Sequence, residues 1–334
     1  MNACLYCKTT LSAENSSREH VLPAALGWDV TISCVCATCN STFGHDIDAE
    51  FIKCFDVYRV KFRVRDREGS TPRPRGRVEG GGLSGKNVRF GVSGPELPRI
   101  IKTRERPGSV DFRTYENHDV AELEKTLAAR KGIGKLQKLS EGREEFKIVS
   151  RHGMEFLSDS RGLRAAVKIV FNFLALKRGS QEALLHPCLD EMRKFIQGTG
   201  ANGRDYFALP MSPMPPEIPL HGLVLTLDGR TGQIRGMVSL FGFIGLFVRI
   251  GDGYTGETCT FATLIDPESR EHRDSSLEGV VPDWVPELDA LHQRLSAMPQ
   301  ALDAHKIEVF HGAIARVNHY FKELGDTFQI APAT

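Results

Sequence analysis

The sequence has 334 residues, with 43 lysines and arginines against 42 aspartates and glutamates, so its formal net charge is +1 at pH 7. The apolar fraction of 41% and the charged fraction of 25% are ordinary for a globular protein, and the length allows two or three modest domains. No apolar run approaches the ~18 residues of a membrane span, and the amino terminus lacks the basic-then-apolar pattern of a signal peptide. These features exclude a membrane-spanning protein and predict a cytoplasmic one.

Residues 1–55 are predicted to form a compact unit in the order strand, strand, helix. Residues 18–22 are the first expected strand, which Pro23 ends, and the β-branched segment 30–35 is the second. Apolar residues then recur three or four positions apart, at Phe43, Ile47, Phe51 and Phe55. This spacing predicts a helix from Asn40 onward. So short a unit cannot bury a normal core, and we expect a metal to hold it together.

The remaining chain predicts an α+β fold. Residues 58–65 fit a helix or a strand, because they keep the helical period and also alternate apolar with basic side chains. Segment 68–98 is rich in glycine, proline and serine and predicts a linker or long loops. Further helices are expected at 160–177, 181–197 and 307–324, and strands at 223–225 and 238–250. We expect three domains: a zinc-stapled ββα unit at 1–65, a basic linker with short strands at 66–110, and a mixed helical and antiparallel β region at 111–334.

Two Cys-x-x-Cys pairs near the amino terminus predict a zinc site. Zinc takes four tetrahedral thiolate or imidazole ligands, usually from two short loops that each supply a pair. Cys4 and Cys7 form one pair, and Cys36 and Cys39 form the other. Cys34 could replace Cys36, although the tighter pair is the better fit. Four thiolates leave no position for water, so this zinc is expected to be structural.

Charge is distributed unevenly along the chain. Residues 1–55 are mainly acidic, whereas residues 59–106 are strongly basic. A metal-binding acidic unit beside a basic segment is typical of a protein that binds and cuts a polyanion. The basic side chains that we expect to contact nucleic acid are Arg59, Lys61, Arg63, Arg65 and Arg67.

The dipeptide Glu19-His20 and the residue Asn40 supply the chemistry that a nuclease needs. A phosphodiester nuclease requires a base that works near neutral pH, and imidazole is the natural choice. It also requires a hard divalent cation held by oxygen ligands. Glu19 and the amide oxygen of Asn40 can provide such ligands, and the zinc site ties their two segments together.

These residues, in this order, resemble the HNH endonuclease family in its zinc-ribbon-bearing branch. The resemblance covers only about the first 55 residues and is carried by Glu19-His20-Val21-Leu22-Pro23, Leu26-Gly27, Cys36-Ala37-Thr38-Cys39-Asn40, Phe43-Gly44 and Asp48. It implies a ββα-metal fold and cleavage of nucleic acid, usually double-stranded DNA. It also implies that His20 is the general base and that Glu19 and Asn40 hold a catalytic Mg²⁺ or Mn²⁺, in addition to the structural Zn²⁺.

Several points stay open at this stage. Thr31 stands where the family has its middle asparagine, with Asp29 nearby, and either could orient the imidazole. The third ligand of the catalytic cation could be His45, Asp46 or Asp48. A homodimer would suit a double-strand break, and the layout is that of restriction or antiphage defence proteins by analogy. The alternative function is a non-catalytic zinc ribbon that binds DNA or a protein.

Overall fold

The computed structural model divides into two compact units. The described residues are 3–66, 68–79, 87–92, 94–96, 100–106, 109–114, 147–149, 160–179, 186–200, 206–210, 220–242 and 244–281. The first compact unit comprises Met1–Ser70 and Met154–Thr334, and the second comprises Thr71–Gly153. The expected domains 1–65, 66–110 and 111–334 stay a prediction. The two compact units have different bounds from these domains.

The amino-terminal segment folds in the expected order strand, strand, helix. β1 (Ser16–His20) pairs with the antiparallel strand β2 (Thr31–Cys36), and η1 (Ala24–Leu26) lies in the connection between them. Three consecutive helical segments follow: α1 (Ala37–Phe43), the π-helix η2 (Gly44–Asp48) and α2 (Ala49–Cys54). The aromatic and aliphatic side chains that predicted this helix are all buried. We refer to residues 3–62 as the head.

The head ends in a further helix rather than a strand. α3 (Asp56–Lys61) continues the helical direction, and Arg63 then adopts a left-handed conformation with φ 55°. The amide of Val64 donates to the carbonyl of Arg59 at 2.8 Å, and Val64 is buried. These are the features of a Schellman C-cap, so the local hydrogen bonding resolves the sequence ambiguity in favour of helix.

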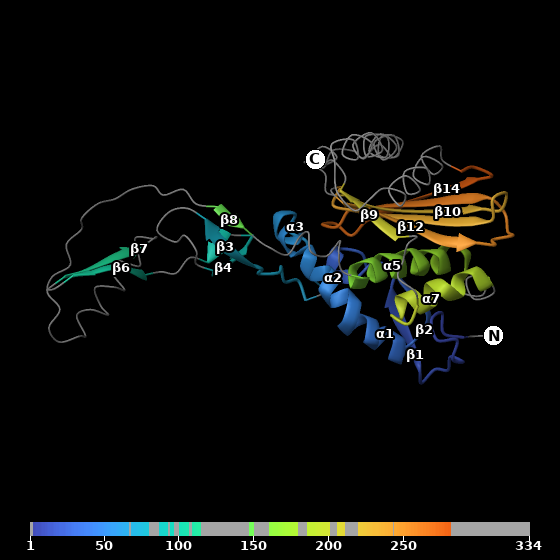
Figure 1. The fold of residues 1–334 in the computed structure, drawn as a ribbon, viewed down its shortest axis with the longest axis horizontal. Helices are drawn as coiled ribbons and strands as arrows, with labels where there is room; N and C mark the ends of the chain where they lie inside the picture. The colour runs from blue at the N-terminus through green and yellow to red at the C-terminus, as the bar shows by residue number, and fades with distance from the viewer. Residues whose placement is uncertain are drawn as a thin grey trace, which may run out of the picture. The chain divides into compact units, whose positions relative to one another are not determined.

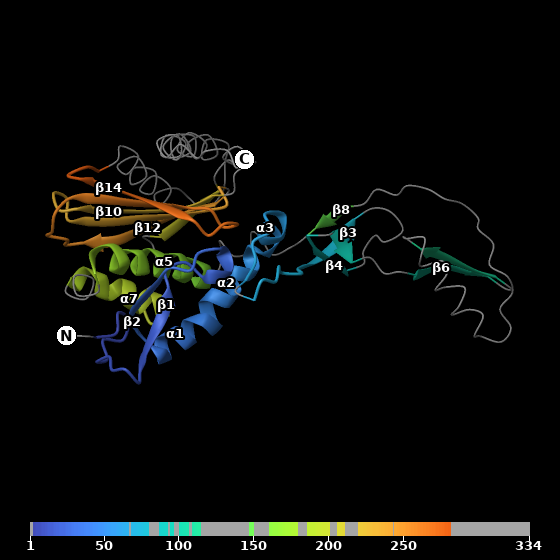
Figure 2. The ribbon, with the colours of Figure 1, turned by 180° about the vertical axis from the view of Figure 1, so that it is seen from behind.

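Beyond the head, the described residues of the first unit form an antiparallel sheet with two helices on one face. The strand order is β14-β13-β10-β11-β12-β9, with the bounds β9 (Tyr206–Pro210), β10 (His221–Asp228), β11 (Gln233–Leu240), β12 (Ile244–Asp252), β13 (Cys259–Ile265) and β14 (His272–Glu278). The helices are α5 (Ser160–Arg178) and α7 (Asp190–Ile196), and η5 (Pro187–Leu189) precedes α7. Figure 1 shows α5 between this sheet and the head, and Figure 2 shows the same order from behind.

One hydrophobic core serves the head, α5 and the sheet. Phe43 and Phe51 of the head belong to the same buried cluster as Phe171 of α5 and Leu225 of β10. The approach of α5 to the sheet is close, because a Cβ on Gly236 would lie 2.2 Å from the Val170 side chain. The head therefore shares its core with α5 and the sheet, which lie far downstream in the sequence.

The second unit contains two small antiparallel sheets. One has the order β5-β4-β3-β8, from β3 (Arg75–Glu79), β4 (Asn87–Gly91), β5 (Gly94–Glu96) and β8 (Lys147–Val149), and the other pairs β6 (Ile100–Arg106) with β7 (Ser109–Thr114). The strands β3, β4 and β5 lie within the segment 68–98, where short strands as well as loops were expected.

Four further expectations have mixed outcomes. The helix expected at 160–177 is confirmed as α5. The described part of the helix expected at 181–197 begins at residue 186, and there α7 follows η5 and starts at Asp190. The strand expected at 238–250 is two strands, because Phe241 and Gly242 turn the chain with φ 54° and 67°. The helix expected at 307–324 lies outside the described residues. Among the helices of the described ranges, none combines the length and the apolar character that a membrane span requires.

His221 at the start of β10 links the sheet to the head. Its Nε2 lies 2.7 Å from the carbonyl of Leu26, and its Nδ1 accepts the amide of Phe241 at 3.1 Å. An accepting Nδ1 requires the neutral tautomer with a proton on Nε2. Burial lowers the pKa of His221 from 6.5 to about 4, although the Leu26 carbonyl opposes this.

We predict that acid weakens this contact. As the pH falls below 6.5, the unfolded chain binds a proton that folded His221 excludes until about pH 4. Folding stability is therefore complete above 6.5 and falls as the pH decreases, by up to about 3 kcal/mol at roughly 1.4 kcal/mol per pH unit. Urea unfolding of the wild type at about pH 7 and about pH 4.5 measures the loss.

His221→Gln is the matched control, because its amide can donate and accept without titrating. Its unfolding free energy should depend less steeply on pH than that of the wild type. Equal losses in the two proteins would show that His221 is not the titrating group.

Candidate active site and zinc centre

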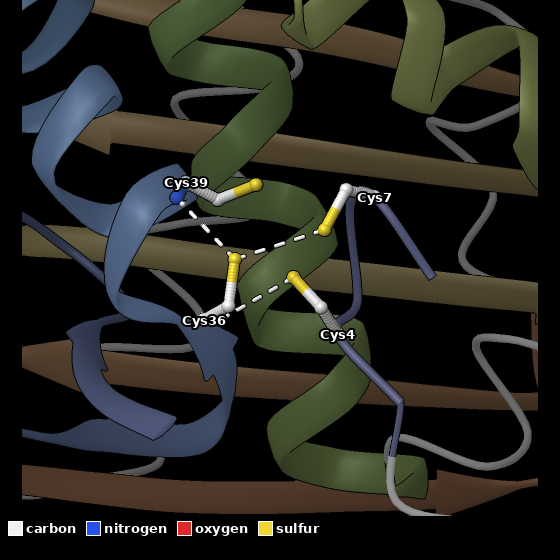
Figure 3. Close-up of side chains that lie close together, drawn as sticks. All are labelled: Cys4, Cys7, Cys36 and Cys39. Carbon is white, nitrogen blue, oxygen red and sulfur yellow. Dashed lines mark hydrogen bonds between the residues drawn. The ribbon is translucent and has the colours of Figure 1, made fainter. Parts of the chain in front are cut away.

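Four cysteine sulfurs converge at one end of the head. Cys4 and Cys7 come from the amino-terminal loop, Cys36 ends β2, and Cys39 lies in the first turn of α1. Figure 3 shows their sulfurs pointing toward one another. The four ligand atoms all lie within 4.8 Å of one another, and the expected four-cysteine cluster is thereby confirmed.

The geometry and the chemistry of this cluster fit zinc. With Zn–S bonds of about 2.3 Å, two sulfurs of a regular tetrahedron lie about 3.8 Å apart, and the sulfurs of Cys7 and Cys36 are 3.7 Å apart. The amide of Cys36 donates to the sulfur of Cys4 at 3.3 Å, and that of Cys39 to the sulfur of Cys36 at 3.4 Å. Such amide hydrogen bonds favour thiolates, which are the form that binds metal.

The thiols differ in acidity. The side chain of Cys39 and three backbone amides lower the pKa of Cys4 to about 4, against burial, which raises it. The pKa of Cys39 is raised, mainly by its neighbour Cys4, and burial raises the pKa of Cys36. Cys4 is therefore the first thiolate of the set. The seven cysteines whose side chains the structure describes form no disulfide.

Glu19 lies at the centre of a buried cluster of charges. Its side chain is 3% exposed, and its Oε1 accepts a hydrogen bond from the ammonium of Lys168, which is fully buried. The same ammonium lies 2.8 Å from Oδ2 of Asp48, at the end of η2. Lys168 belongs to α5, so the downstream chain supplies the cation that neutralises the head's carboxylates.

Asn172, one turn further along α5, holds the Glu19-His20 dipeptide. Its Nδ2 donates to the carbonyl of His20 at 3.0 Å and lies 3.4 Å from Oε1 of Glu19. The hydroxyl of Tyr6 donates to Oδ1 of Asn172 at 2.5 Å. Because Tyr6 stands between Cys4 and Cys7, one asparagine connects the zinc centre to the candidate catalytic strand.

Burial and charge set the ionisation of this cluster. Burial would lower the pKa of Lys168, but the carboxylates of Asp48 and Glu19 outweigh it and the pKa is raised. Burial raises the pKa of Glu19, against the opposing effect of the Lys168 ammonium. Burial, together with the charges of Glu19 and Asp48, raises the pKa of Tyr6 and keeps the phenol neutral as a donor. Lys168 is therefore a charged ammonium at neutral pH.

His20 and Asn40 occupy different surroundings from Glu19. His20 is half-buried, whereas its neighbour Glu19 is buried, as the alternation of side chains on a strand requires. Asn40 donates from Nδ2 to Oγ of Ser17 at 2.7 Å and to the carbonyl of Arg18 at 3.0 Å. These two hydrogen bonds hold the Asn40 amide against β1.

The two residues expected to orient the imidazole contact arginines. Thr31 pairs with His20 in the β ladder, but its hydroxyl accepts from Nε of Arg18 at 3.2 Å. The carboxylate of Asp29 accepts from Arg270 at 2.5 Å. Orientation of the His20 backbone comes instead from Asn172, which the sequence did not single out. The signal for it in the sequence was a lysine and an asparagine four positions apart within the otherwise apolar stretch 165–175 of this helix.

The donors expected for a catalytic divalent cation are chemically suitable, but an ammonium engages one of them. Glu19 offers a carboxylate, and Asn40 has its Oδ1 in addition to the Nδ2 that faces β1. Of the three candidates for a third ligand, Asp48 lies beside Glu19 and shares Lys168 with it. Asp46 instead pairs with Arg164 of α5 at 3.0 Å.

The expected nucleic-acid contacts divide into buried and exposed residues. Arg59 has a 6% exposed side chain, and its guanidinium lies 2.8 Å from Asp56. A buried guanidinium cannot reach a phosphate, so we remove Arg59 from the contact set. Lys61, Arg63 and Arg65 are exposed, and Arg67 lies outside the described residues.

We predict that the protein contains about one zinc per chain and that Cys36→Ser loses it. A missing thiolate opens the tetrahedron, and since the head depends on the metal, the Tm should fall by about 10 °C or more. Elemental analysis and thermal unfolding measure the two effects. Cys34→Ser is the matched control, because Cys34 lies outside the four-sulfur cluster. If it lost zinc instead, the ligand set would be Cys4, Cys7, Cys34 and Cys39.

Comparison with known families gives one match, and it coincides with the head. Comparison with the curated proteins and with the solved structures gives no match. The matching model covers only a small part of the chain, and it includes both cysteine pairs, Glu19, His20, Asn40 and Asp48. Residues 4–56 match the model of the HNH endonuclease family.

Proposed function

We propose that the protein is a metal-dependent endonuclease that hydrolyses phosphodiester bonds in DNA, with His20 as the general base. One observation carries the proposal: a Glu-His dipeptide on a zinc-anchored ββα head lies within the segment that matches the HNH endonuclease family. The residue His20 is half-buried, and Asn172 holds its backbone.

The reaction that these residues support is in-line hydrolysis. The imidazole of His20 takes a proton from water, the resulting hydroxide attacks phosphorus, and the 3′ oxygen departs. A divalent cation on Glu19 and Asn40, Mg²⁺ or Mn²⁺, would supply positive charge for the phosphate and the departing oxygen. His20 is then an imidazolium; it releases its proton to solvent, the departing 3′ oxygen takes up a proton from solvent, and neutral imidazole is restored.

The charge distribution supports a polyanionic substrate. Lys61 at the end of the head is exposed, and so are Arg63 and Arg65, which follow the head directly. In the second unit, Arg75 and Arg89 are exposed and directly opposite each other in the β3–β4 ladder. Like charges at such positions are unfavourable without an anion between them, which supports a polyanionic partner, and we propose that this partner is double-stranded DNA. Cleavage of both strands would require two heads, and a homodimer would supply them.

One observation favours the alternative of a non-catalytic zinc ribbon that binds DNA or a protein. The carboxylate of Glu19 is buried against Lys168, as it would be in a purely structural ion pair. The two functions differ in one measurable property, the metal-dependent hydrolysis of DNA. A role in restriction or antiphage defence in the cytoplasm would follow only from the catalytic function.

We predict that the purified protein nicks supercoiled plasmid with Mg²⁺ or Mn²⁺ and that His20→Ala is slower by about 10²–10⁴-fold. This factor is the usual contribution of general base catalysis. Nicking should stop with a chelator and return when the divalent cation is restored. The matched control is His272→Ala, which removes an exposed histidine of β14. Wild-type rates for His20→Ala, with unchanged zinc content, would remove His20 from the mechanism.

We also predict that the triple variant Lys61→Ala, Arg63→Ala, Arg65→Ala binds DNA with a weaker dependence on salt. Each lost phosphate contact lowers the slope of log K against log salt by about 0.9, so the slope should change by about three. The matched control replaces Lys53, Lys194 and Arg230, whose side chains are 62%, 54% and 65% exposed and pair with acidic residues. Equal slopes in the two variants would contradict the assignment.

A further inference from the structure

The buried ammonium of Lys168 occupies a position between two carboxylates. One carboxylate comes from β1 of the head and the other from the end of η2, and α5 brings the lysine to both. The side chains are 0% exposed for Lys168, 3% for Glu19 and 14% for Asp48. The two carboxylates thus surround a cation, and that cation is the side-chain ammonium of a residue of α5.

The site carries more negative charge than Lys168 neutralises. With both carboxylates ionised, two negative charges face one positive charge, and the other polar partners, Tyr6 and Asn172, are neutral. Oδ1 of Asp48 is buried and has no hydrogen-bond partner among the described residues. A buried carboxylate oxygen without a partner is unfavourable, so the cluster can accept a cation of higher charge.

The neighbouring acidic residue is neutralised separately. Arg164, one turn before Lys168 on α5, pairs with Asp46 at 3.0 Å, and Asp46 is 41% exposed. α5 thus presents one cation to each of the two acidic residues of η2. Of these two, only Asp48 shares its cation with Glu19.

We propose that Asp48 joins Glu19 as a ligand of the divalent cation, and that the ammonium of Lys168 competes with the divalent cation for these two carboxylates. The role of the site in cleavage rests on the proposed nuclease function, whereas the competition does not. Because the site is available only when Lys168 withdraws, the apparent affinity for the divalent cation is reduced by the fraction of time that the lysine occupies it. Lys168 therefore sets the cation concentration at which the head is loaded.

Mn²⁺ binding to the full-length, zinc-loaded protein tests the competition. Electron paramagnetic resonance measures the free Mn²⁺ remaining at each concentration and requires no catalytic activity. Lys168→Met keeps the length of the side chain without its charge, and it should bind Mn²⁺ about tenfold or more tightly than the wild type. Adding Glu19→Gln to Lys168→Met should abolish that gain. Equal affinity of the wild type and Lys168→Met, or a gain that survives Glu19→Gln, overturns the proposal.

A second pair of variants keeps the test decisive if Lys168→Met fails to fold. Removing the ammonium leaves two buried carboxylates uncompensated, whereas Lys168→Met with Asp48→Asn restores the wild-type net charge of the cluster. The comparison is then with Asp48→Asn alone. The double variant should bind Mn²⁺ more tightly than Asp48→Asn, and equal affinity overturns the proposal.

Binding and cleavage can fail independently. Tighter Mn²⁺ binding by Lys168→Met without any plasmid nicking would support the competition and contradict the nuclease function. Nicking by the wild type, with Mn²⁺ affinity that does not change in Lys168→Met, would support the nuclease function and contradict the competition.

Discussion

The buried contact between Lys168 and the carboxylates of Glu19 and Asp48 is the interaction on which the arrangement of the first unit depends. An ammonium without exposure to water needs charged partners, and both of its partners belong to the head. Removing one member of such a buried pair typically costs about 3–5 kcal/mol, because it leaves an uncompensated charge. The head and α5 are therefore coupled electrostatically as well as through their common core.

Further polar contacts couple the zinc centre to the downstream helices. Tyr6 donates to Asn172 of α5, and Arg193 of α7 donates to the carbonyl of Leu5 at 2.8 Å. Both head residues lie between Cys4 and Cys7, so the first zinc knuckle is held by two different helices. The head resembles an independent zinc-stabilised module in sequence, but its hydrogen bonds and its core make it part of a larger unit.

This coupling changes how the family resemblance should be interpreted. The family match ends at residue 56, yet the groups that neutralise Glu19 and hold the His20 backbone belong to α5. A ββα head can keep every residue expected of a nuclease while a distant helix determines whether a cation reaches those residues. The surroundings of Glu19 and of the His20 backbone are therefore set by Lys168 and Asn172 as well as by the head's own motif.

The sequence by itself determined the features that depend on local spacing. The two cysteine pairs predicted the four-sulfur cluster, and the apolar period predicted the head helix and α5, because short-range geometry follows directly from residue spacing. Only the tertiary structure decided which acidic residue meets Glu19. The π-helical turn at Gly44–Asp48 breaks the regular helical period, so counting from Asn40 could not separate Asp46 from Asp48. Lys168 and Glu19 are 149 positions apart, so the spacing of neighbouring residues could not predict their contact. The burial of Arg59 could not be predicted in this way either. Both arise only when distant segments form one core.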